Sequence, residues 1–369
     1  MLLAQGLARR FRHAVDGEIQ VTVVTPTPAG YMDDRTLPFR MVREPGMGDL
    51  VREIWQADII HLAGPCFLPM LFGLLLRKPV VVEHDIYQAA CPNGLLIHEQ
   101  SKTVCPGHFM SGRYAECLRC NAGQGNVKKS LKMLALTFPR RWLCRRVARN
   151  IAPTDHVGKR VSLPRTVTIH HGVSEVLPAQ RLTEDHQGLK INFAFVGRLV
   201  REKGVSVLLG AARELAHRGY DFRLNIIGEG PERVNLEGIT DEYGLRDRTT
   251  FCGSLQGDRL REAMLGKWVA VMPSIWEDVA PLAAIEHMIQ GRLLIASDIG
   301  GLGELVDGVG LKFPSGDVSS LAACLQRVLD EPSLATTLGK KARERGLRLF
   351  REDRMVADHL ALYRDLVAA

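Results

Sequence analysis

No apolar run in this sequence is long enough to cross a membrane; the longest, around Phe67 to Leu76, is too short. The N-terminus also lacks the pattern of a secretory signal peptide, because Arg9 and Arg10 follow the apolar start instead of preceding it. Eight cysteines without such a signal favour reduced thiols or a bound metal over disulfides. These absences predict a cytoplasmic protein.

Aromatic side chains are not interleaved with the basic residues, and no known nucleic-acid motif is present, so we expect no nucleic-acid partner. The charge itself is uneven. Residues 1–180 contain 23 Lys and Arg against 14 Asp and Glu, a balance of +9, whereas residues 181–369 contain 25 against 27, a balance of −2. The first half is therefore expected to meet an anionic partner.

The length of 369 residues predicts two domains, and 46% hydrophobic with 24% charged residues is typical of soluble globular proteins. Apolar strand patterns alternate with helical patterns over short loops, which predicts an α/β protein with parallel, doubly wound sheets. We expect a first domain at 1–173 with an insert at 89–125, a polar linker at 174–190, a second domain at 191–352, and a final helix at 353–369 that crosses back to the first domain.

One stretch, from Pro273 to Gly308, organises the second half. A strand enters a polar loop with Glu277 and Asp278, and Pro281 then opens a helix that Gly291 ends. A second strand leads to a Gly-Gly loop and another helix start. Two loops at the carboxyl ends of parallel strands, each with carboxylates and a helix N-terminus, predict a site for a phosphorylated ligand.

The stretch resembles the C-terminal signature of retaining, nucleotide-sugar-dependent glycosyltransferases of family 4, which have the GT-B fold of two Rossmann-like domains facing across a cleft. Their pattern is a Glu, seven residues, a second Glu, a strand, and a Gly-Gly loop ending in Glu. Asp278 and Glu286 have this spacing, with Asp in place of the usual first Glu, and Glu277 lies one residue out of register. Because Asp is one methylene shorter than Glu, Asp278 is less suited than the usual Glu to contact the sugar directly.

The resemblance implies a role for each matching residue. Arg198 and Lys203, in FVGRLVREKG, match the pair that binds the donor diphosphate. Glu286 matches the acid that binds the ribose hydroxyls. His84 stands where the family has a His near the donor sugar, the alternative being a His that only ends a strand. The catalytic candidates are His84, Asp278 and Glu286, and the donor-binding candidates are Arg198, Lys203, Gly228, Glu286, Gly300, Gly301 and Leu302.

The family's first strand and its glycine-rich loop precede a helix like the one predicted at the start of this chain, and both are missing here. That strand is central in the family's N-terminal sheet, so its loss would expose unpaired backbone. We expect the natural start to lie upstream of Met1; the alternative is another segment that fills the gap.

The insert at 89–125 contains Cys91, Cys105, Cys117 and Cys120. Cys117 and Cys120 form a C-x2-C pair of the kind that tetrahedral zinc favours, and the other two could complete a structural zinc site, with His98 or His108 as substitutes. The alternative is four reduced cysteines in a loop with little periodicity on the acceptor side.

A basic stretch follows, from Asn126 to Asn150, in which Lys and Arg interleave with apolar residues. It is either a solvated helix face or a peripheral contact with an anionic membrane, with Leu131, Leu134 and Trp142 entering the headgroup layer.

The resemblance implies a retaining transferase that moves a sugar from a nucleotide diphosphate to a hydroxyl of a glycan or lipid-linked acceptor, on the inner face of the membrane, without a catalytic cofactor or metal. The alternatives are another GT-B reaction, such as a phosphorylase or a sugar-nucleotide epimerase, and a weakly active nucleotide-sugar-binding protein.

Overall fold

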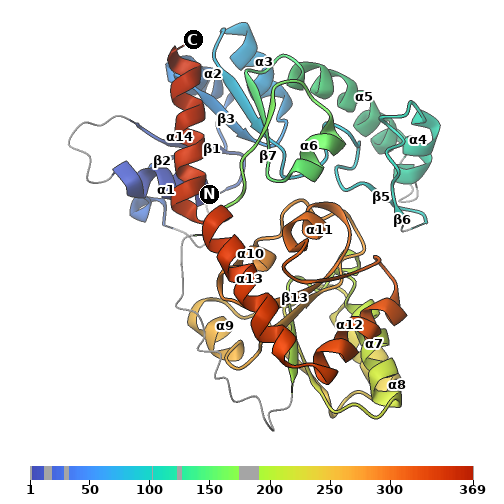
Figure 1. The fold of residues 1–369 in the computed structure, drawn as a ribbon. Helices are drawn as coiled ribbons and strands as arrows, with labels where there is room; N and C mark the ends of the chain where they lie inside the picture. The colour runs from blue at the N-terminus through green and yellow to red at the C-terminus, as the bar shows by residue number, and fades with distance from the viewer. Residues whose placement is uncertain are drawn as a thin grey trace. The chain divides into compact units, whose positions relative to one another are not determined.

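The computed structural model describes residues 2–11, 19–28, 33–101, 103–122, 127–173 and 191–368. They divide into two compact units (Figure 1). The first contains Met1–Gly94, Gly107–Ser174 and Phe350–Ala369, and the second contains Leu95–Pro106 and Glu175–Leu349. Each unit is built on parallel strands joined by helices, so the predicted α/β class with two Rossmann-like domains is confirmed. The predicted linker at 174–190 lies outside the described residues.

The second unit contains a six-stranded parallel sheet in the order β11-β10-β9-β12-β13-β14. The central strands β12 and β13 are apolar and buried along their whole length, as expected where helices cover both faces of a parallel sheet. The strands are β9 (Asn192–Val196), β10 (Arg223–Ile227), β11 (Thr249–Gly253), β12 (Val269–Met272), β13 (Leu293–Ser297) and β14 (Leu311–Phe313).

The helices of this unit follow the strands in turn. They are η2 (Arg201–Lys203), α7 (Val205–His217), α8 (Arg233–Glu242), α9 (Gly257–Ala263), α10 (Leu282–Ile289), α11 (Gly300–Val306), α12 (Val318–Asp330) and α13 (Ser333–Leu349). We predicted Pro281 at the first helical position of α10, but it is the N-cap, which precedes that position by one residue. Gly291 follows the helix with a φ of 78°.

The strand order of the second unit reverses between β9 and β12. From β9 the chain moves outward to β10 and β11, and it then returns to place β12 on the other side of β9. Loops that follow the two strands diverge at such a point, and the space between them is where open α/β sheets bind ligands.

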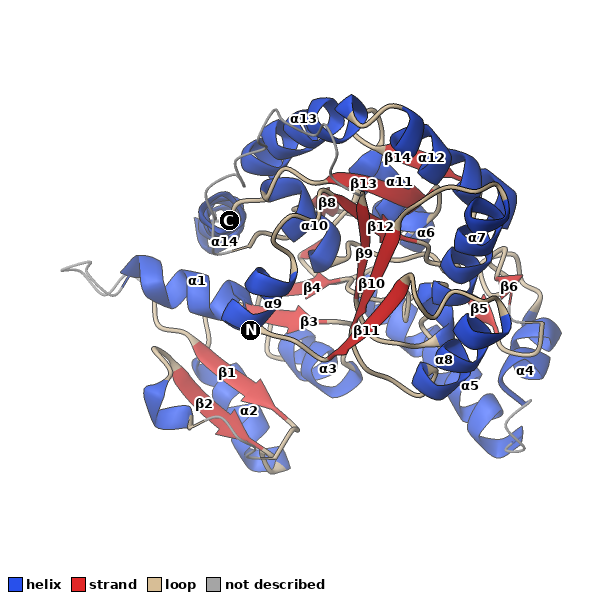
Figure 2. Ribbon diagram, turned by 90° about the horizontal axis from the view of Figure 1, so that it is seen from below, coloured by secondary structure: helices blue, strands red, loops and turns tan. Residues whose placement is uncertain are grey.

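In the first unit, a four-stranded parallel sheet has the order β3-β4-β7-β8, and β1 and β2 form a separate parallel pair (Figure 2). Within the described ranges no strand joins the two sheets. The strands are β1 (Thr22–Thr25), β2 (Arg40–Arg43), β3 (Ile60–Ala63), β4 (Val80–Glu83), β7 (Arg149–Ala152) and β8 (Thr166–Thr168).

The helices of the first unit include the C-terminal helix α14. It packs against α1 and contributes Met355, Val356 and Leu360 to a core cluster with Val81 of β4 and Ile151 of β7. The helices are α1 (Leu2–Phe11), η1 (Asp34–Thr36), α2 (Met47–Gln56), α3 (Phe67–Leu75), α4 (Tyr114–Ala122), α5 (Val127–Cys144), α6 (Asp155–Val161) and α14 (Glu352–Ala368).

The cysteine-containing insert is more regular than its sequence suggested. It contains α4 and a short antiparallel hairpin of β5 (Ile97–His98) and β6 (Thr103–Val104). The basic stretch that follows forms α5, an 18-residue helix that accommodates Pro139. Among the described residues, no helix is both long enough and apolar enough to cross a membrane.

Candidate functional site

An ion pair joins the two loops that diverge from the reversal point of the second sheet. Lys203 ends η2 in the loop after β9, and Asp278 lies in the loop after β12. The Nζ atom of Lys203 lies 2.7 Å from Oδ2 of Asp278. Only 17% of the lysine side chain and 7% of the aspartate side chain are exposed, so the pair is largely removed from water.

The backbone brings these loops together because glycine follows Lys203. Gly204 adopts a φ of 67°, and a Cβ atom there would lie 1.9 Å from the carbonyl oxygen of Pro273. The Ile275 amide also donates to the Glu202 carbonyl at 2.9 Å. Any larger residue at 204 would push the loops apart and separate the ion pair.

Two side chains of this site, Ser274 and Trp276, were not predicted from the sequence. Ser274 is buried and its Oγ donates to Oδ2 of Asp278 at 2.9 Å. The Trp276 ring lies near Lys203, with 5.7 Å from Nζ to the ring centroid, and its indole Nε1 is buried without a hydrogen-bond partner in the described part of the chain. A polar residue and a tryptophan directly after a buried strand were the signals that could have identified them.

Arg198 and Glu286 lie on the same carboxyl edge of the sheet, after β9 and on α10. Arg198 is exposed, and no described residue pairs with its guanidinium. Glu286 is also exposed by surface area, yet desolvation by the protein atoms around its carboxylate raises its pKa above the ordinary value. No hydrogen bond or ion pair with a described residue engages either side chain.

The predicted glycines have mixed roles. A Cβ at Gly228, where φ is 147°, would lie 1.8 Å from the Gly197 carbonyl oxygen, so close packing of two loops already requires glycine there. Gly300, Gly301 and Leu302 form the buried start of α11. The Gly301 amide donates to the Asp278 carbonyl at 2.7 Å. That amide therefore supports the loop of Asp278 and is not available to a ligand in this conformation.

His84 follows β4 in the first unit and is buried. Its Nε2 donates to Oδ1 of Asn150 at 2.9 Å, since the Asn150 amide nitrogen is used by the carbonyls of Cys144 and Pro164. Burial lowers the pKa of His84, so the ring is neutral and Nδ1 carries a lone pair. Nδ1 has no partner among the described residues.

A group of titratable side chains lies next to His84. The Glu83 carboxylate accepts from His61 Nε2 at 3.1 Å and lies 3.5 Å from His171 Nε2, which is 3.1 Å from Asp85. Burial opposes ionisation of Glu83, but the hydrogen bonds from His171 and His61 prevail and lower its pKa. Despite burial, the hydrogen bonds of His171 to Asp85 and Glu83 raise its pKa to about 10.

The four cysteines of the predicted zinc site are all buried. In the first unit, Cys91 Sγ donates to Asn93 Oδ1 at 2.9 Å, and Asn93 Nδ2 donates to Cys120 Sγ at 3.7 Å. Cys117 lies one helical turn before Cys120 on α4, and Cys105 belongs to the segment grouped with the second unit. A zinc ion on this set remains a prediction.

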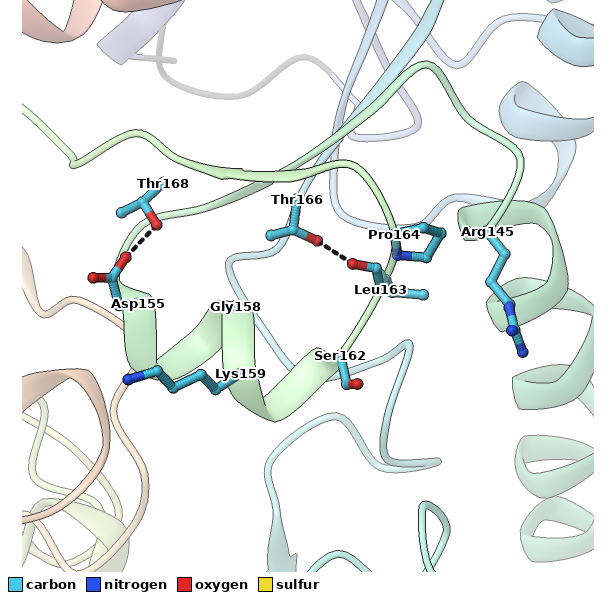
Figure 3. A pocket seen from close by; sticks show the side chains of 9 residues that line it. All are labelled: Arg145, Asp155, Gly158, Lys159, Ser162, Leu163, Pro164, Thr166 and Thr168. Atoms are coloured by element: carbon cyan, nitrogen blue, oxygen red, sulfur yellow. Dashed lines mark hydrogen bonds between the residues drawn. The ribbon is translucent and has the colours of Figure 1, made fainter.

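A hollow of about 610 Å³ lies over α6 and β8 in the first unit (Figure 3). Arg145 and Lys159 line it beside the hydrogen-bonded pair of Thr168 and Asp155. It contains none of the predicted site residues.

Residues 180–345, which include the Lys203–Asp278 pair, match the model of the family "Glycosyl transferases group 1". This stretch is therefore similar to a glycosyl transferases group 1 domain. The 2-deoxystreptamine glucosyltransferase of Streptomyces kanamyceticus is 39% identical over 144 residues, 38% of this chain and 36% of that protein. The phosphatidylinositol N-acetylglucosaminyltransferase gpi3 subunit of Schizosaccharomyces pombe is 25% identical over 273 residues, 72% of this chain and 57% of that protein.

Solved structures extend the likeness beyond the residues that match this family. Sucrose-phosphate synthase from Thermosynechococcus elongatus superposes with a TM-score of 0.70 at 22% identity, over 99% of this chain and 92% of that one. Anabaena HepE in complex with UDP and glucose gives 0.70 at 15% identity, over 99% and 95%. The chain thus has the GT-B fold. The similarity spans little more than a third of the length of the 2-deoxystreptamine glucosyltransferase.

Proposed function

We propose that this protein is a retaining glycosyltransferase of family 4, which transfers a sugar from a nucleotide diphosphate to a hydroxyl acceptor. The observation that carries the proposal is the Lys203–Asp278 pair at the reversal point of the second sheet, inside the region that matches the group 1 family. A leaving diphosphate gains negative charge, and a fixed cation in a site with little water stabilises that charge strongly.

Arg198 and Lys203 bind the donor diphosphate in this proposal. The exposed Arg198 offers a planar pair of donors, and Lys203 offers a point charge whose position is already fixed. Their positive field makes a catalytic metal unnecessary. Glu286 accepts hydrogen bonds from the donor ribose.

Asp278 acts through Lys203. Its Oδ2 atom is engaged by both Lys203 and Ser274, so its task is to orient the lysine. This assignment explains how an Asp functions where the family usually has a Glu: the shorter side chain reaches the lysine of the neighbouring loop. We therefore revise our interpretation of Asp278 from a catalytic residue to a positioning residue.

His84 is proposed to accept a hydrogen bond from a hydroxyl of the donor sugar at Nδ1. Asn150 fixes the ring and its tautomer, and the lone pair of Nδ1 has no partner among the described residues. The acceptor hydroxyl attacks on the face that the nucleotide leaves, and a departing phosphate oxygen takes its proton. The anomeric configuration is thereby retained.

The acceptor is proposed to be a glycan or a lipid-linked precursor in the synthesis of surface polysaccharide or glycolipid. The relatives named above include one whose name specifies 2-deoxystreptamine and one whose name specifies phosphatidylinositol, so both small polar and lipid acceptors occur among proteins similar to this one.

Helix α5 supports peripheral contact with an anionic membrane. Val127, Leu131, Phe138 and Trp142 share one helix face and are 67%, 57%, 44% and 52% exposed. The exposed Lys128 and Lys132 flank this face, Lys129 lies on the opposite side of the helix, and Arg145 follows its C-terminal end. Basic residues around an exposed apolar stripe are typical of helices that lie in the headgroup region.

Two residues of the predicted membrane contact have other tasks. Leu134 is only 6% exposed and packs against Phe109 and Cys117, so its predicted entry into the headgroups is wrong. The Arg141 guanidinium donates to the carbonyls of Ala89, Val161 and Ser162, which makes it part of the folded unit.

A structural zinc ion on Cys91, Cys105, Cys117 and Cys120 is the remaining part of the proposal. Four thiolates leave no position open for water, so this zinc would stabilise the insert without taking part in transfer.

The proposal is tested by screening nucleotide sugars for thermal stabilisation, since a ligand that binds the folded state raises its stability with occupancy. The stabilising donor is then incubated with hydroxyl acceptors, and the anomeric configuration of the product is determined by NMR. An inverted product rejects retention. Turnover of the donor without an acceptor indicates an epimerase, and transfer to free phosphate indicates a phosphorylase. Binding without turnover under every condition leaves the weakly active binding protein.

A further inference from the structure

Three polar side chains from distant parts of the chain meet under helix α14 in the first unit. His61 comes from β3, Glu83 from the end of β4, and His359 from α14. One ligand atom of each lies within 4.8 Å of the other two. His359 is 1% exposed, and the side chains of His61 and Glu83 are 19% and 10% exposed, so the group is nearly closed to solvent.

Both histidines are fixed by hydrogen bonds at the ring nitrogen that points away from the group. His61 Nδ1 lies 2.7 Å from the hydroxyl of Tyr363, and His359 Nδ1 donates to the Met355 carbonyl at 2.8 Å. Nε2 of each ring then faces the interior of the group, and a metal bound there would replace the proton that His61 Nε2 donates to Glu83. Metal-binding histidines are oriented in this way by partners of the second nitrogen.

The Nε2 atom of His359 has no hydrogen-bond partner within the described ranges, although it is buried. Buried polar atoms in folded proteins are usually hydrogen-bonded, so this nitrogen needs an explanation, and a bound ion is one that its position among other metal-binding side chains supplies. Because Nδ1 carries the proton that goes to Met355, Nε2 offers a lone pair directed to a cation or to a donor.

We propose that His61, Glu83 and His359 bind one divalent transition-metal ion that fixes α14 to the sheet of the first unit.

The donor set suits zinc or a similar ion. Two imidazoles and one carboxylate are ligands that zinc, cobalt and nickel accept, whereas magnesium and calcium favour oxygen alone. Tetrahedral bonds of about 2.0–2.2 Å place two ligand atoms roughly 3.3–3.6 Å apart. The His61 Nε2 to Glu83 Oε2 distance of 3.1 Å is close to that value.

The ion would join segments that are far apart in the sequence. Tyr363, one turn after His359 on the same face of α14, is 302 residues from His61. Because the ion would bind residues of β3 and β4 as well as His359, it would stabilise the packing of α14 on these two strands. This inference is independent of the proposed sugar transfer.

A second group shares Glu83 and includes Asp85 and His171. The side chain of Asp85 is 44% exposed, and His171 is already engaged by both carboxylates. We assign the ion to the histidine pair because it is better shielded from water and contains the orphaned nitrogen.

The test begins with the wild-type chain, stripped by a chelator, dialysed and titrated with Co²⁺. Cobalt on two imidazoles and a carboxylate gives visible d–d bands without the thiolate charge-transfer band that cysteine ligands produce. We expect one equivalent of such a site, apart from any cobalt on Cys91, Cys105, Cys117 and Cys120. A titration that shows only thiolate-bound cobalt, or none, overturns the proposal.

Variants then locate the ion. His359→Gln is expected to abolish the stoichiometric d–d signal, while His217→Gln, which removes an exposed histidine from α7, keeps it. Tyr363→Phe retains the packing of the ring and loses the hydroxyl next to His61, so cobalt affinity should fall roughly tenfold to a hundredfold. A full signal in folded His359→Gln, or one lost only in His171→Gln, overturns the assignment. Unchanged cobalt affinity in Tyr363→Phe contradicts it even where His359→Gln does not fold.

Hydrogen exchange provides the structural readout. Zinc should slow amide exchange along α14 in the wild type and leave α12 and α13 of the other unit unchanged. Equal exchange of α14 with and without zinc would contradict the docking role.

Discussion

Lys203 Nζ and Asp278 Oδ2 lie 2.7 Å apart and connect the loops that follow β9 and β12. Removing both charges from water is costly, and the pair is favourable only if further hydrogen bonds support it. Ser274 provides such support by donating to the same oxygen. The arrangement keeps a cation ready for a diphosphate without ligand-induced rearrangement, which reduces the entropic cost of binding.

Lys203 and Asp278 should therefore behave as a unit. Asp278→Ala should weaken binding of the nucleotide diphosphate because the lysine loses its orientation. Lys203→Ala removes the charge itself, so adding Asp278→Ala to it should have little further effect. We expect an interaction energy of about 0.5–3 kcal/mol in the double-mutant cycle, measured by calorimetric titration of the nucleotide. Additive losses would show that Asp278 acts separately, for example on the sugar.

Arg198 is expected to contribute a charge-assisted contact worth roughly 1.5–3 kcal/mol, so Arg198→Ala should reduce nucleotide affinity about tenfold to a hundredfold or more. The fold should be unaffected, because the side chain is exposed and has no partner among the described residues. Arg201→Ala, which removes an exposed cation three residues away, is the matched control. Equal nucleotide affinities of the two variants would reject the assignment.

The second unit was the more predictable of the two. Strand patterns alternate there with helical patterns over short loops, so Arg198, Lys203 and Glu286 could be placed on one edge of a sheet from the sequence. The contact of Lys203 with Asp278 could not, because it depends on how closely Gly204 lets two loops approach. The burial of Leu134 depends on Phe109 and Cys117, which belong to an insert without a clear pattern.

Long-range contacts were the least predictable. His359 appeared in the sequence as one histidine of a C-terminal helix, and nothing local relates it to His61 or Glu83. Only the packing of α14 on β3 and β4 brings the three together. Sequence periodicity can predict that such a helix buries one face, but it does not show which strand it meets.

Glu286 should determine whether the protein distinguishes ribose from deoxyribose. Its carboxylate offers two acceptor oxygens, whereas a glutamine offers one acceptor and one donor. Glu286→Gln should lower affinity for UDP or GDP, whichever binds, and leave the 2′-deoxy nucleotide almost unaffected. Desolvation raises the pKa of Glu286, so its carboxylate is protonated earlier as the pH is lowered. The affinity of the wild type for the nucleotide should therefore begin to fall at a higher pH than it would with an ordinary glutamate. A wild type that binds both nucleotides equally contradicts the role.

His287 should make the second unit sensitive to acid. Burial lowers its pKa to about 3, whereas in the unfolded chain it titrates near its ordinary value of about 6.5. Between these values only the unfolded state takes up the proton, so stability falls as pH falls, by at most about 1.4 kcal/mol per pH unit. Urea unfolding at pH 5 and pH 7 should show a larger loss for the wild type than for His287→Leu. Parallel losses would mean that His287 is protonated in the folded state.

Helix α5 provides the test of membrane contact. Each basic residue near an anionic surface contributes about 1 kcal/mol, so Lys128, Lys129, Lys132 and Arg145 together could give useful reversible binding. In vesicle sedimentation, Lys128→Gln with Lys129→Gln should reduce binding to anionic vesicles about tenfold or more. The matched pair Lys340→Gln and Lys341→Gln removes the same charge from exposed positions on α13 and should have little effect.

The apolar face of α5 requires its own variant, because the same positive charge could instead steer an anionic nucleotide sugar into its site. Trp142→Ser with Leu131→Ser removes two of the most exposed apolar side chains of the helix and leaves its Lys and Arg residues in place. If the helix enters the headgroup layer, this variant should lose vesicle binding at moderate salt, where the electrostatic contribution is screened. Its donor affinity should not change. Equal recovery of wild type and variant in the supernatant, with anionic and neutral vesicles at low salt, would leave steering as the role of the basic half.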